Sequence, residues 1–403
     1  MEDLGRSRRA SSTRLAEAPG RLDFGDAAFQ SRPWPLYEWY RQHDPVHWSP
    51  QAATFFAFGY GHVRHVLVST EFGAHHPFRK SSRAFGVTVL DKDGEPHRTL
   101  RSRIAPPFRR PRSADFVDDA IVPLAKEMVR ELVAEGHEDG VQRLAERLPM
   151  RIVCRLLGIA DSHVEWLREK LRPLVLYVDH APVSLEAVIQ HRRELASFLV
   201  GERELTSPDG LLESLLGDKE LSEAEAVSNL VLVLAAGTET TTAALGNLML
   251  RLATEEGLLS TLKADPHTVP AAVAESLRLD PPLHWTLRFA HRDTKLGGVE
   301  IPGGAPVQVC VASANRDPEV FERPESWSLD RVQRPVPLTF GAGRHACLGM
   351  ALARAELEAV ACELAWTSQR LELPDSASAE ISGRTFRTVP QLRLRVVPEP
   401  ARL

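Results

Sequence analysis

The residue best placed to do chemistry is one cysteine, Cys347, in the run FGAGRHACLG at positions 340–349. Glycines in this run allow a loop to turn tightly and to bring backbone N–H groups close to a partner. The apolar spacing that follows predicts a helix over 348–366, so Cys347 lies where that helix begins. Unpaired N–H donors and the positive end of the helix dipole both favour the thiolate, the form of cysteine that binds metals.

A single thiolate without companion ligands suits an axial ligand to haem iron. The plainer alternative is that Cys347 is a small buried hydrophobe, as most lone cysteines are. The other cysteines, Cys154, Cys310 and Cys362, lack comparable neighbours and keep that plainer interpretation. Because the four cysteines are widely spaced and form no CxxC pair, neither a disulfide framework nor a zinc site is expected.

A long helix predicted over 221–256 carries a second candidate site. Ser222 and Glu225 have the spacing of a capping box at its start, and its all-round apolar centre places it inside a large domain. The run LAAGTETT at 234–241 is unusual there, because a helical glycine costs about 1 kcal/mol relative to alanine and threonines divert backbone hydrogen bonds. The run is either a tolerated irregularity or a local distortion that makes room for a small ligand.

Two further pairs of polar residues have spacings that place them on one helix face. Glu275 and Arg278 are three residues apart, and His97 and Arg101 are four apart. Either pair alone would more often be a surface pair. Their meaning therefore depends on the rest of the chain.

Taken together, these segments resemble the cytochrome P450 family. The run at 340–349 matches the family's cysteine-ligand loop, Phe-x-x-Gly-x-x-x-Cys-x-Gly, which is highly specific, and the likeness extends from about Phe24 to Pro398. It implies a mainly α fold with a smaller β region, a triangular helix-rich prism around a buried haem. We therefore expect a flexible tail over 1–20 and a single catalytic domain over 21–403.

The resemblance also implies roles for individual residues. Cys347 would be the axial ligand of the haem iron, Glu239 and Thr240 the catalytic acid–alcohol pair that delivers protons, and Glu275 and Arg278 a structural pair beneath the haem. The residues expected to contact the cofactor are His97, Arg101, Ala236, Gly237, Arg288, Phe340, Gly341, His345, Cys347 and Gly349.

Within that set, two groups differ in what they would contact. Ala236 and Gly237 would line the oxygen-binding groove. The propionates would be met by charge-assisted hydrogen bonds, which are the strong ones, from His97, Arg101, Arg288 and His345.

One departure from the family pattern concerns the Glu–Arg pair. The family usually supplies a further arginine or histidine in a Pro-Glu-Arg-Phe element, whereas this chain has Ser326 at that position. Arg323 is the candidate replacement. What the departure puts in doubt is haem stability rather than reaction type.

Other elements are predicted from periodicity alone. They are an amphipathic helix through Leu124, Met128 and Leu132, a strand over 54–58 that could pair with 46–48, and a hairpin that joins 299–301 to 307–311.

The activity implied by the resemblance is that of a haem-thiolate monooxygenase. It would insert one oxygen atom from O₂ into a hydrophobic small molecule, by hydroxylation or epoxidation, in bacterial secondary-metabolite biosynthesis. The alternatives are a non-insertion oxidation, such as aryl coupling or desaturation, and a non-catalytic haem-binding protein. The latter would have no need of Glu239 and Thr240.

The implied cofactor is haem b, iron protoporphyrin IX, and the implied electron source is NAD(P)H acting through ferredoxin reductase and ferredoxin. The basic cluster Arg109, Arg110 and Arg112 could dock an acidic ferredoxin, although a solvated surface is the equally simple interpretation.

The substrate is expected to be apolar and could be bound to a carrier protein. Its pocket would be walled by residues 75–90, 170–190, 235–240, 284–288 and about 382–386, with Phe85, Val87, Trp285 and Leu287 as apolar walls and His284 as a polar contact.

Composition sets the remaining expectations. The chain has 403 residues and a formal net charge of −5, which does not suggest nucleic-acid binding. It has neither an apolar run of membrane-spanning length nor an apolar core like that of a signal peptide near its start. We therefore expect a cytoplasmic protein, without a membrane anchor, that is a monomer.

Overall fold

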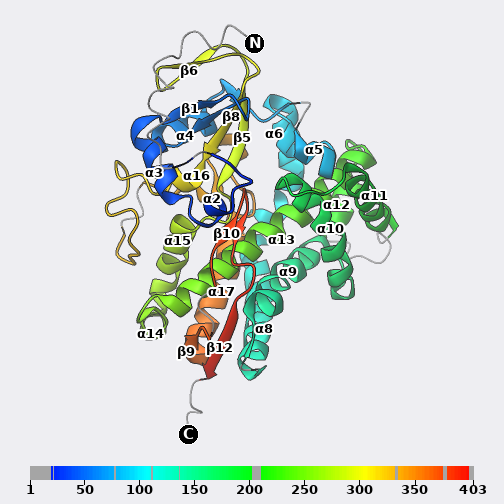
Figure 1. Ribbon diagram of the computed structural model, residues 1–403. Helices are drawn as coiled ribbons and strands as arrows, with labels where there is room; N and C mark the ends of the chain where they lie inside the picture. The colour runs from blue at the N-terminus through cyan, green and yellow to red at the C-terminus, as the bar shows by residue number, and fades with distance from the viewer. Residues whose placement is uncertain are drawn as a thin grey trace.

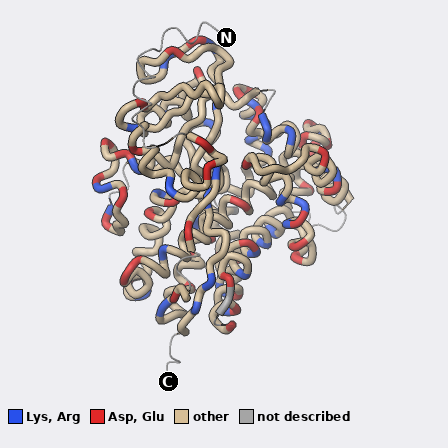
Figure 2. Tube along the Cα trace, in the orientation of Figure 1, with Lys and Arg blue, Asp and Glu red and all other residues tan. Residues whose placement is uncertain are grey.

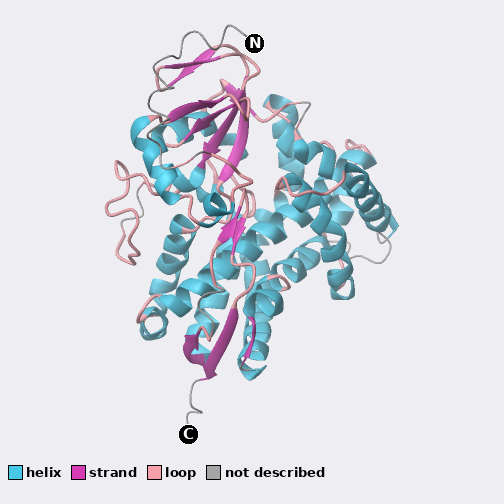
Figure 3. Ribbon diagram, in the orientation of Figure 1, coloured by secondary structure: helices cyan, strands magenta, loops and turns pink. Residues whose placement is uncertain are grey.

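The computed structural model describes residues 20, 22–76, 79–109, 112–135, 137–201, 210–331, 335–374 and 379–398. The tail predicted over 1–20 therefore lies almost entirely outside the described residues. Helices make up most of the described chain; the largest sheet lies towards one end of the molecule, and the strands over 368–372 and 393–398 lie at the other end (Figures 1 and 3). Lysine and arginine are interspersed with aspartate and glutamate along the whole trace (Figure 2).

The α-helices, in chain order, are α2 (Ala27–Ser31), α3 (Trp34–His43), α4 (Tyr60–Val68), α5 (Lys80–Phe85), α6 (Gly94–Ile104), α7 (Arg112–Phe116), α8 (Val122–Glu135), α9 (Leu148–Leu157), α10 (Val164–Val178), α11 (Leu185–Gly201), α12 (Leu211–Leu216), α13 (Glu223–Thr254), α14 (Leu258–Ala264), α15 (Val269–Leu279), α16 (Val311–Ala314) and α17 (Met350–Thr367).

The strands, in chain order, are β1 (Val46–Ser49), β2 (Thr54–Ala57), β3 (Phe72–Gly73), β4 (His137–Asp139), β5 (Trp285–Ala290), β6 (Thr294–Leu296), β7 (Val299–Ile301), β8 (Pro306–Cys310), β9 (Ser368–Glu372), β10 (Ser382–Gly383), β11 (Arg387–Thr388) and β12 (Arg393–Pro398).

The long helix α13 is the central element, as the sequence predicts. The Ser222 side chain accepts the N–H of Glu225 and the Glu225 side chain accepts the N–H of Ser222, so the predicted capping box is confirmed. The N-terminal half of α13 packs into one apolar cluster with α9, α10 and α11, and its C-terminal half packs into another with α8, α15 and α17. Its apolar character on all sides follows from this position between two clusters.

The largest sheet among the described residues has the strand order β1-β2-β8-β5-β3. β1 and β2 pair antiparallel, with Val46 opposite Ala57, so the predicted pairing of 46–48 with 54–58 is confirmed. β8 lies parallel to β2 and antiparallel to β5. This sheet holds β5, which carries Arg288.

The hairpin predicted between 299–301 and 307–311 is wrong. β7 pairs with β6 instead, across a turn in which Gly297 and Gly298 have φ of +57° and +80°. Two consecutive residues with positive φ close a tight hairpin of this kind. The alternation in β8 comes from its place in the middle of the large sheet, between β2 and β5.

Along the described ranges, every helix is either too short or too polar to cross a membrane.

Candidate functional site

Cys347 lies at the end of a tight loop between a short helical turn, Leu338–Phe340, and α17. The N–H of Cys347 donates to the carbonyl of Phe340 at 2.9 Å, which closes the loop. Gly341 and Gly343 have φ of +68° and +72°. A Cβ on Gly343 would lie 2.7 Å from the carbonyl oxygen of Leu67. The glycines of the motif are therefore required by backbone conformation and by close contact with α4.

The surroundings of the Cys347 sulfur have opposing effects on its charge. Cys347 is an exposed residue. The protein atoms around its sulfur nevertheless raise the pKa of the thiol by desolvation. The N–H groups of Gly349 and Met350 and the Arg101 guanidinium lower that pKa. Those N–H groups are the first of α17, as expected from the sequence. Arg101 also donates from Nη2 to the carbonyl of Ala346 at 2.5 Å. Three positive or N–H groups thus face one sulfur atom.

The loop is held from beneath by Asn315. Its Oδ1 accepts the N–H of Leu338 at 2.6 Å, and its Nδ2 donates to Oγ1 of Thr339 at 2.8 Å. The Thr339 hydroxyl in turn donates to the carbonyl of Leu277 in α15 at 2.7 Å. The start of the cysteine loop is therefore fixed to α15 by side-chain hydrogen bonds.

Glu275 and Arg278 of α15 are fully buried and lie directly below this support. Arg278 donates from Nε and Nη2 to the two carboxylate oxygens of Glu275, each at 2.8 Å. Its Nη1 donates to the carbonyls of Asn315 at 2.9 Å and Pro324 at 2.7 Å. The pair is thus connected through Asn315 to the cysteine loop, which agrees with a structural role.

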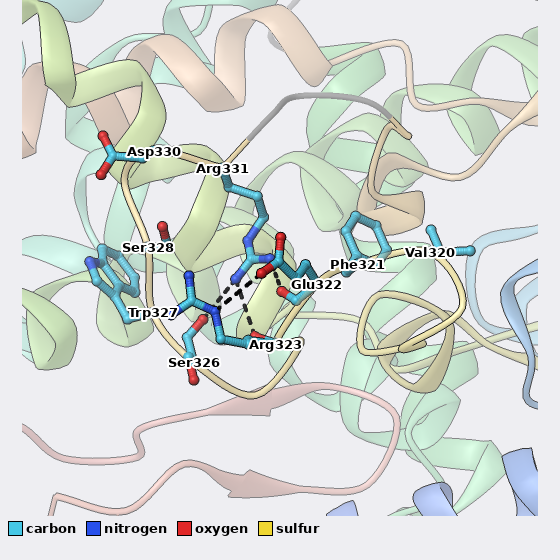
Figure 4. Close-up of a pocket in the computed structure, with 9 residues that line it drawn as sticks. All are labelled: Val320, Phe321, Glu322, Arg323, Ser326, Trp327, Ser328, Asp330 and Arg331. Carbon is cyan, nitrogen blue, oxygen red and sulfur yellow. Dashed lines mark hydrogen bonds and ion pairs between the residues drawn. The ribbon is translucent and has the colours of Figure 1, made fainter.

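The second cation on Glu275 is Arg331, and the expectation that Arg323 takes this place is wrong. Arg331 Nε lies 3.1 and 3.0 Å from the two Glu275 oxygens. Arg323 has a φ of +45° and a side chain that is 77% exposed beside Glu322. Arg331 is held by the carbonyls of Glu322, Arg323 and Ser326, and lines a hollow of about 370 Å³ whose walls come from residues 320–331 (Figure 4). The replacement for Ser326 is therefore the arginine five residues later.

The run at 234–241 lies within the uninterrupted α-helix α13. The Thr240 hydroxyl donates to the carbonyl of Ala236 at 2.8 Å, and the Thr238 hydroxyl donates to that of Leu234 at 2.7 Å. Both threonines thus bond to the carbonyl four residues earlier. Ala236 is exposed although α13 crosses the middle of the molecule (Figure 1).

Gly237 has a packing role that the sequence did not reveal. A Cβ at this position would lie 2.8 Å from Cγ2 of Val153 in α9. The glycine is therefore needed for the close approach of α13 and α9. On the helix surface, Ala236 is exposed and Thr240, four residues later on the same face, is half-buried; these two residues form the accessible stripe.

Burial raises the pKa of Glu239 to about 7, and Glu146 adds to the rise, while Arg168 and Arg172 oppose it. Arg168 is engaged elsewhere, with Glu146 and with Glu165. The carboxyl group can therefore exchange a proton near neutral pH, which the ordinary pKa of 4.5 would not allow.

The four residues predicted to meet carboxylates come together from three parts of the chain. His97 and Arg101 lie on α6, Arg288 lies on β5, and His345 lies in the cysteine loop. The rings of His97 and His345 are 4.2 Å apart between centroids. Arg288 is buried, and burial with the nearby Arg79 lowers its pKa to about 10. The structure thus gathers positive and proton-donating groups in one place.

The donor set fits a dianionic partner such as the two haem propionates. His97 is buried, and within the described part of the chain neither of its ring nitrogens has a hydrogen-bond partner. Burial, His345 and Arg101 lower the pKa of His97 to about 4. A buried polar group without a partner calls for a ligand or ion. Cys347 and the four residues His97, Arg101, Arg288 and His345, here called the cationic cluster, would together hold a haem: the sulfur would bind the iron and the cluster would bind the propionates.

Asp93 lies beside the cationic cluster, and the sequence analysis did not select it. Its Oδ1 accepts His345 Nε2 at 3.0 Å and Arg344 Nε at 3.3 Å, and its Oδ2 accepts the N–H groups of Ala74 and His75. Those hydrogen bonds hold its pKa well below the usual range. A signal was present in its place just before α6, where acidic residues are favoured at a helix N-terminus.

Two residues expected at the substrate pocket are core residues instead. Trp285 is buried in an aromatic cluster and donates from Nε1 to the hydroxyl of Tyr37 at 3.0 Å. His284 is buried, 3.3 Å from the same hydroxyl, and its ring lies 5.2 Å from that of Trp34. The interpretation of Trp285 as a pocket wall is therefore wrong, and His284 has a structural environment. Leu287 and Val87 are at least partly exposed.

The basic cluster predicted near the start of α7 is only partly described. Arg109 is exposed. Arg110, and the side chain of Arg112, lie outside the described residues. Of the other cysteines, Cys154 and Cys310 are buried; burial raises the pKa of the Cys154 thiol to about 12 and that of the Cys310 thiol well above its ordinary value. In the described ranges no group of His, Cys, Asp and Glu is arranged to hold a metal ion by itself.

Comparisons with known proteins show the family to which the chain is similar. A family model described as cytochrome P450 matches residues 262–365. The chain is 32% identical over 337 residues to the putative cytochrome P450 YjiB of Bacillus subtilis (strain 168). The matched region covers 80% of this chain and 84% of that protein. It is 32% identical over 304 residues to 6-deoxyerythronolide B hydroxylase of Saccharopolyspora erythraea, 72% of this chain and 73% of the relative.

A solved structure, that of CalO2, matches with a TM-score of 0.86 at 27% identity, over 94% of this chain and 99% of the other. The expected fold, mainly α with a smaller β region, is thereby confirmed as the cytochrome P450 fold. The family also implies a haem cofactor and electron supply from redox partners. The chain belongs to the cytochrome P450 family, as a haem-dependent monooxygenase.

Proposed function

We propose that this protein inserts one oxygen atom from O₂ into a hydrophobic small molecule, by hydroxylation or epoxidation, in bacterial secondary-metabolite biosynthesis. The observation that carries the proposal is the pairing of the Cys347 loop with an accessible stripe of α13 that presents Thr240 and Ala236. Leu348, next to Cys347, packs against the apolar cluster that contains Leu234 and Ala235 of α13. The relative named 6-deoxyerythronolide B hydroxylase supports hydroxylation in particular.

Cys347 would hold the iron of haem b, and the four residues of the cationic cluster would bind its propionates. When bound, the haem supplies the oxygen-activating redox chemistry, while the protein supplies orientation and protons. Arg101 would act twice, since it is close both to the propionate site and to the Cys347 sulfur. Phe340, Gly341 and Gly349 would shape the backbone that surrounds the iron ligand.

Thr240 and Glu239 would move protons. The Thr240 hydroxyl donates to Ala236 and keeps lone pairs for a further hydrogen bond, so it can hold a proton donor in place at Oγ1. Glu239 has a pKa of about 7 and so can take up and release protons near neutral pH. The small side chain of Ala236 leaves space beside that hydroxyl.

The electrons would come from NAD(P)H through ferredoxin reductase and ferredoxin. Arg109 is exposed in the region assigned to docking, and an acidic ferredoxin is the complementary partner. The substrate, free or bound to a carrier protein, would meet the apolar residues Val87 and Leu287, whereas Phe85, also expected at the pocket, is buried in an apolar core cluster. We further propose that the protein acts as a cytoplasmic monomer.

The test is product analysis under ¹⁸O₂ with NADPH and a surrogate ferredoxin and reductase, after a spin-state screen of natural-product precursors has found a substrate. One labelled oxygen in the product is the expected result. An oxidised product without label would contradict oxygen insertion and favour aryl coupling or desaturation.

A further inference from the structure

The loop between α5 and α6 is tied to α13 by one fully buried side chain, that of Asn229. Its Oδ1 accepts the N–H of Val89 at 2.9 Å, and its Nδ2 donates to the carbonyl of Glu225 at 2.8 Å. Asn229 has 0% exposure. A buried amide with both ends satisfied fixes the two backbones that it joins.

The same loop, residues 86–92, is attached to α13 on either side of Val89. Gly86 has a φ of +89°, and a Cβ there would lie 2.2 Å from Oγ of Ser228, so the loop backbone lies directly on the helix. At the other end, Lys92 forms an ion pair with Glu225 at 2.6 Å. The loop thus contacts the first turns of α13 at three successive points.

Internal hydrogen bonds make the loop a rigid unit between those attachments. Asp91 Oδ2 accepts the N–H of Thr88 at 2.9 Å and its hydroxyl at 2.8 Å, and the Thr88 hydroxyl accepts the N–H of Leu90 at 3.2 Å. Arg79 donates to the carbonyl of Leu90 at 2.7 Å. Val87, an apolar residue of the same loop, has a side chain that is 56% exposed.

The attachment lies on the helix face that carries the proposed site. Asn229, Val233, Ala236 and Thr240 are spaced by four, three and four residues and therefore share one face. At 1.5 Å per residue, Asn229 is about 10 Å along the axis from Ala236. Val233 is half-buried and Ala236 is exposed, whereas Asn229 is covered by the loop. The loop therefore closes one end of the accessible stripe.

We propose that Asn229 is a positioning residue for substrate selection: it holds loop 86–92, and with it Val87, as a fixed end wall of the pocket above α13. The wall limits the length of an apolar substrate that can lie along the stripe from Thr240 to Val233. The proposal rests on the proposed function, because the pocket is that of the monooxygenase.

The first test is amide hydrogen exchange of the native holoenzyme. The Val89 amide should exchange slowly although it lies in a loop, because it opens only when the Asn229 hydrogen bond breaks. In Asn229→Ala this exchange should become about tenfold faster or more, the effect of losing one buried hydrogen bond. Val89 exchange in the native protein as fast as that of an exposed loop amide would overturn the proposal.

The second test uses two azole probes that bind haem iron, imidazole and the longer 4-phenylimidazole. In Asn229→Ala the ratio of their association rates should shift by about tenfold in favour of the longer probe, because the loop opens more often. The carbon monoxide spectrum should be unchanged. An unchanged ratio would mean that the loop is not the end wall.

Two control variants separate positioning from general stability. Asn229→Asp, in its neutral form, can reproduce both hydrogen bonds and should retain slow exchange and the native ratio. Asn247→Leu removes the other fully buried asparagine of α13, which donates to the carbonyls of Asp280 and Arg387. This variant should lower stability and leave the azole ratio as it is. Hydrogen exchange and azole binding do not depend on turnover, so a failure of this inference can be distinguished from a failure of the proposed function.

Discussion

Arg331 donates from Nε to both carboxylate oxygens of Glu275, at 3.1 and 3.0 Å, and so completes a buried network with Arg278. The network continues through Asn315 to the N–H of Leu338, which begins the short turn Leu338–Phe340, and the carbonyl of Phe340 accepts the N–H of Cys347. A side chain remote from the sulfur thus determines where the cysteine loop lies.

The first prediction concerns this network. Arg331→Ala removes one of the two arginines that donate to buried Glu275 and leaves the pair with Arg278 in place; loss of a hydrogen bond to a charged group costs about 1.5–3 kcal/mol. We expect a lower urea midpoint and a lower haem-to-protein ratio. Arg323→Ala is the matched control, since this arginine is 77% exposed, and should change stability by less than about 0.5 kcal/mol. Equal effects of the two substitutions would contradict the assignment of Arg331.

The second prediction concerns Thr240. Proton delivery by a positioned group contributes about 10²–10⁴-fold in rate, so Thr240→Ala should lower product formed per NADPH by roughly tenfold or more. The lost reducing equivalents should appear as hydrogen peroxide. Thr240→Ser keeps the hydroxyl that bonds to Ala236 and should retain coupling. Unchanged product yield in Thr240→Ala would show that the relay is elsewhere.

The third prediction follows from the raised pKa of Glu239, about 7 in the fold against an ordinary 4.5. Between those two values the native state holds a proton that the unfolded state releases, so stability falls as pH rises through this window. Glu239→Gln is neutral at every pH. It should be more stable than the native protein at pH 8 and equally stable at pH 4, as measured by urea unfolding. A constant difference across this range would contradict the assigned pKa.

The fourth prediction concerns the cationic cluster. Hydrogen bonds to charged groups are worth about 1.5–3 kcal/mol, so Arg288→Ala should speed haem loss by about tenfold or more. Transfer of haem to excess apomyoglobin measures this rate without any turnover. Arg292→Ala removes an arginine that is 76% exposed just beyond the same strand and should leave the rate within twofold. A similar rate of haem loss in both variants would show that Arg288 does not bind a propionate.

Local spacing predicted much of the fold and of the candidate site. The capping box of Ser222 and Glu225, the pairing of β1 with β2 and the helical pair Glu275–Arg278 each depend on residues close in sequence, or on one short connection. Such features follow from periodicity and capping rules. The cysteine loop could also be predicted from the sequence, because Gly341 and Gly343 adopt positive φ angles that favour glycine.

The features that the sequence did not predict depend on contacts between distant segments. β7 and β8 alternate in the same way, yet only the whole sheet places β8 between β2 and β5. Trp285 is buried because its strand presents it to Tyr37, and alternation alone does not say which face meets the core. Arg331 contacts Glu275 although the two residues are far apart in sequence, whereas the side chain of Arg323 is exposed.

The most direct measurement of the sulfur–iron bond is the spectrum of the reduced, haem-loaded protein with carbon monoxide. We expect the red-shifted Soret band of thiolate ligation, its loss in Cys347→Ser, and its retention in Cys362→Ser, where an exposed cysteine of α17 is removed. A thiolate band that survives in Cys347→Ser, or a protein that takes up no haem when supplied with it, would contradict the central claim.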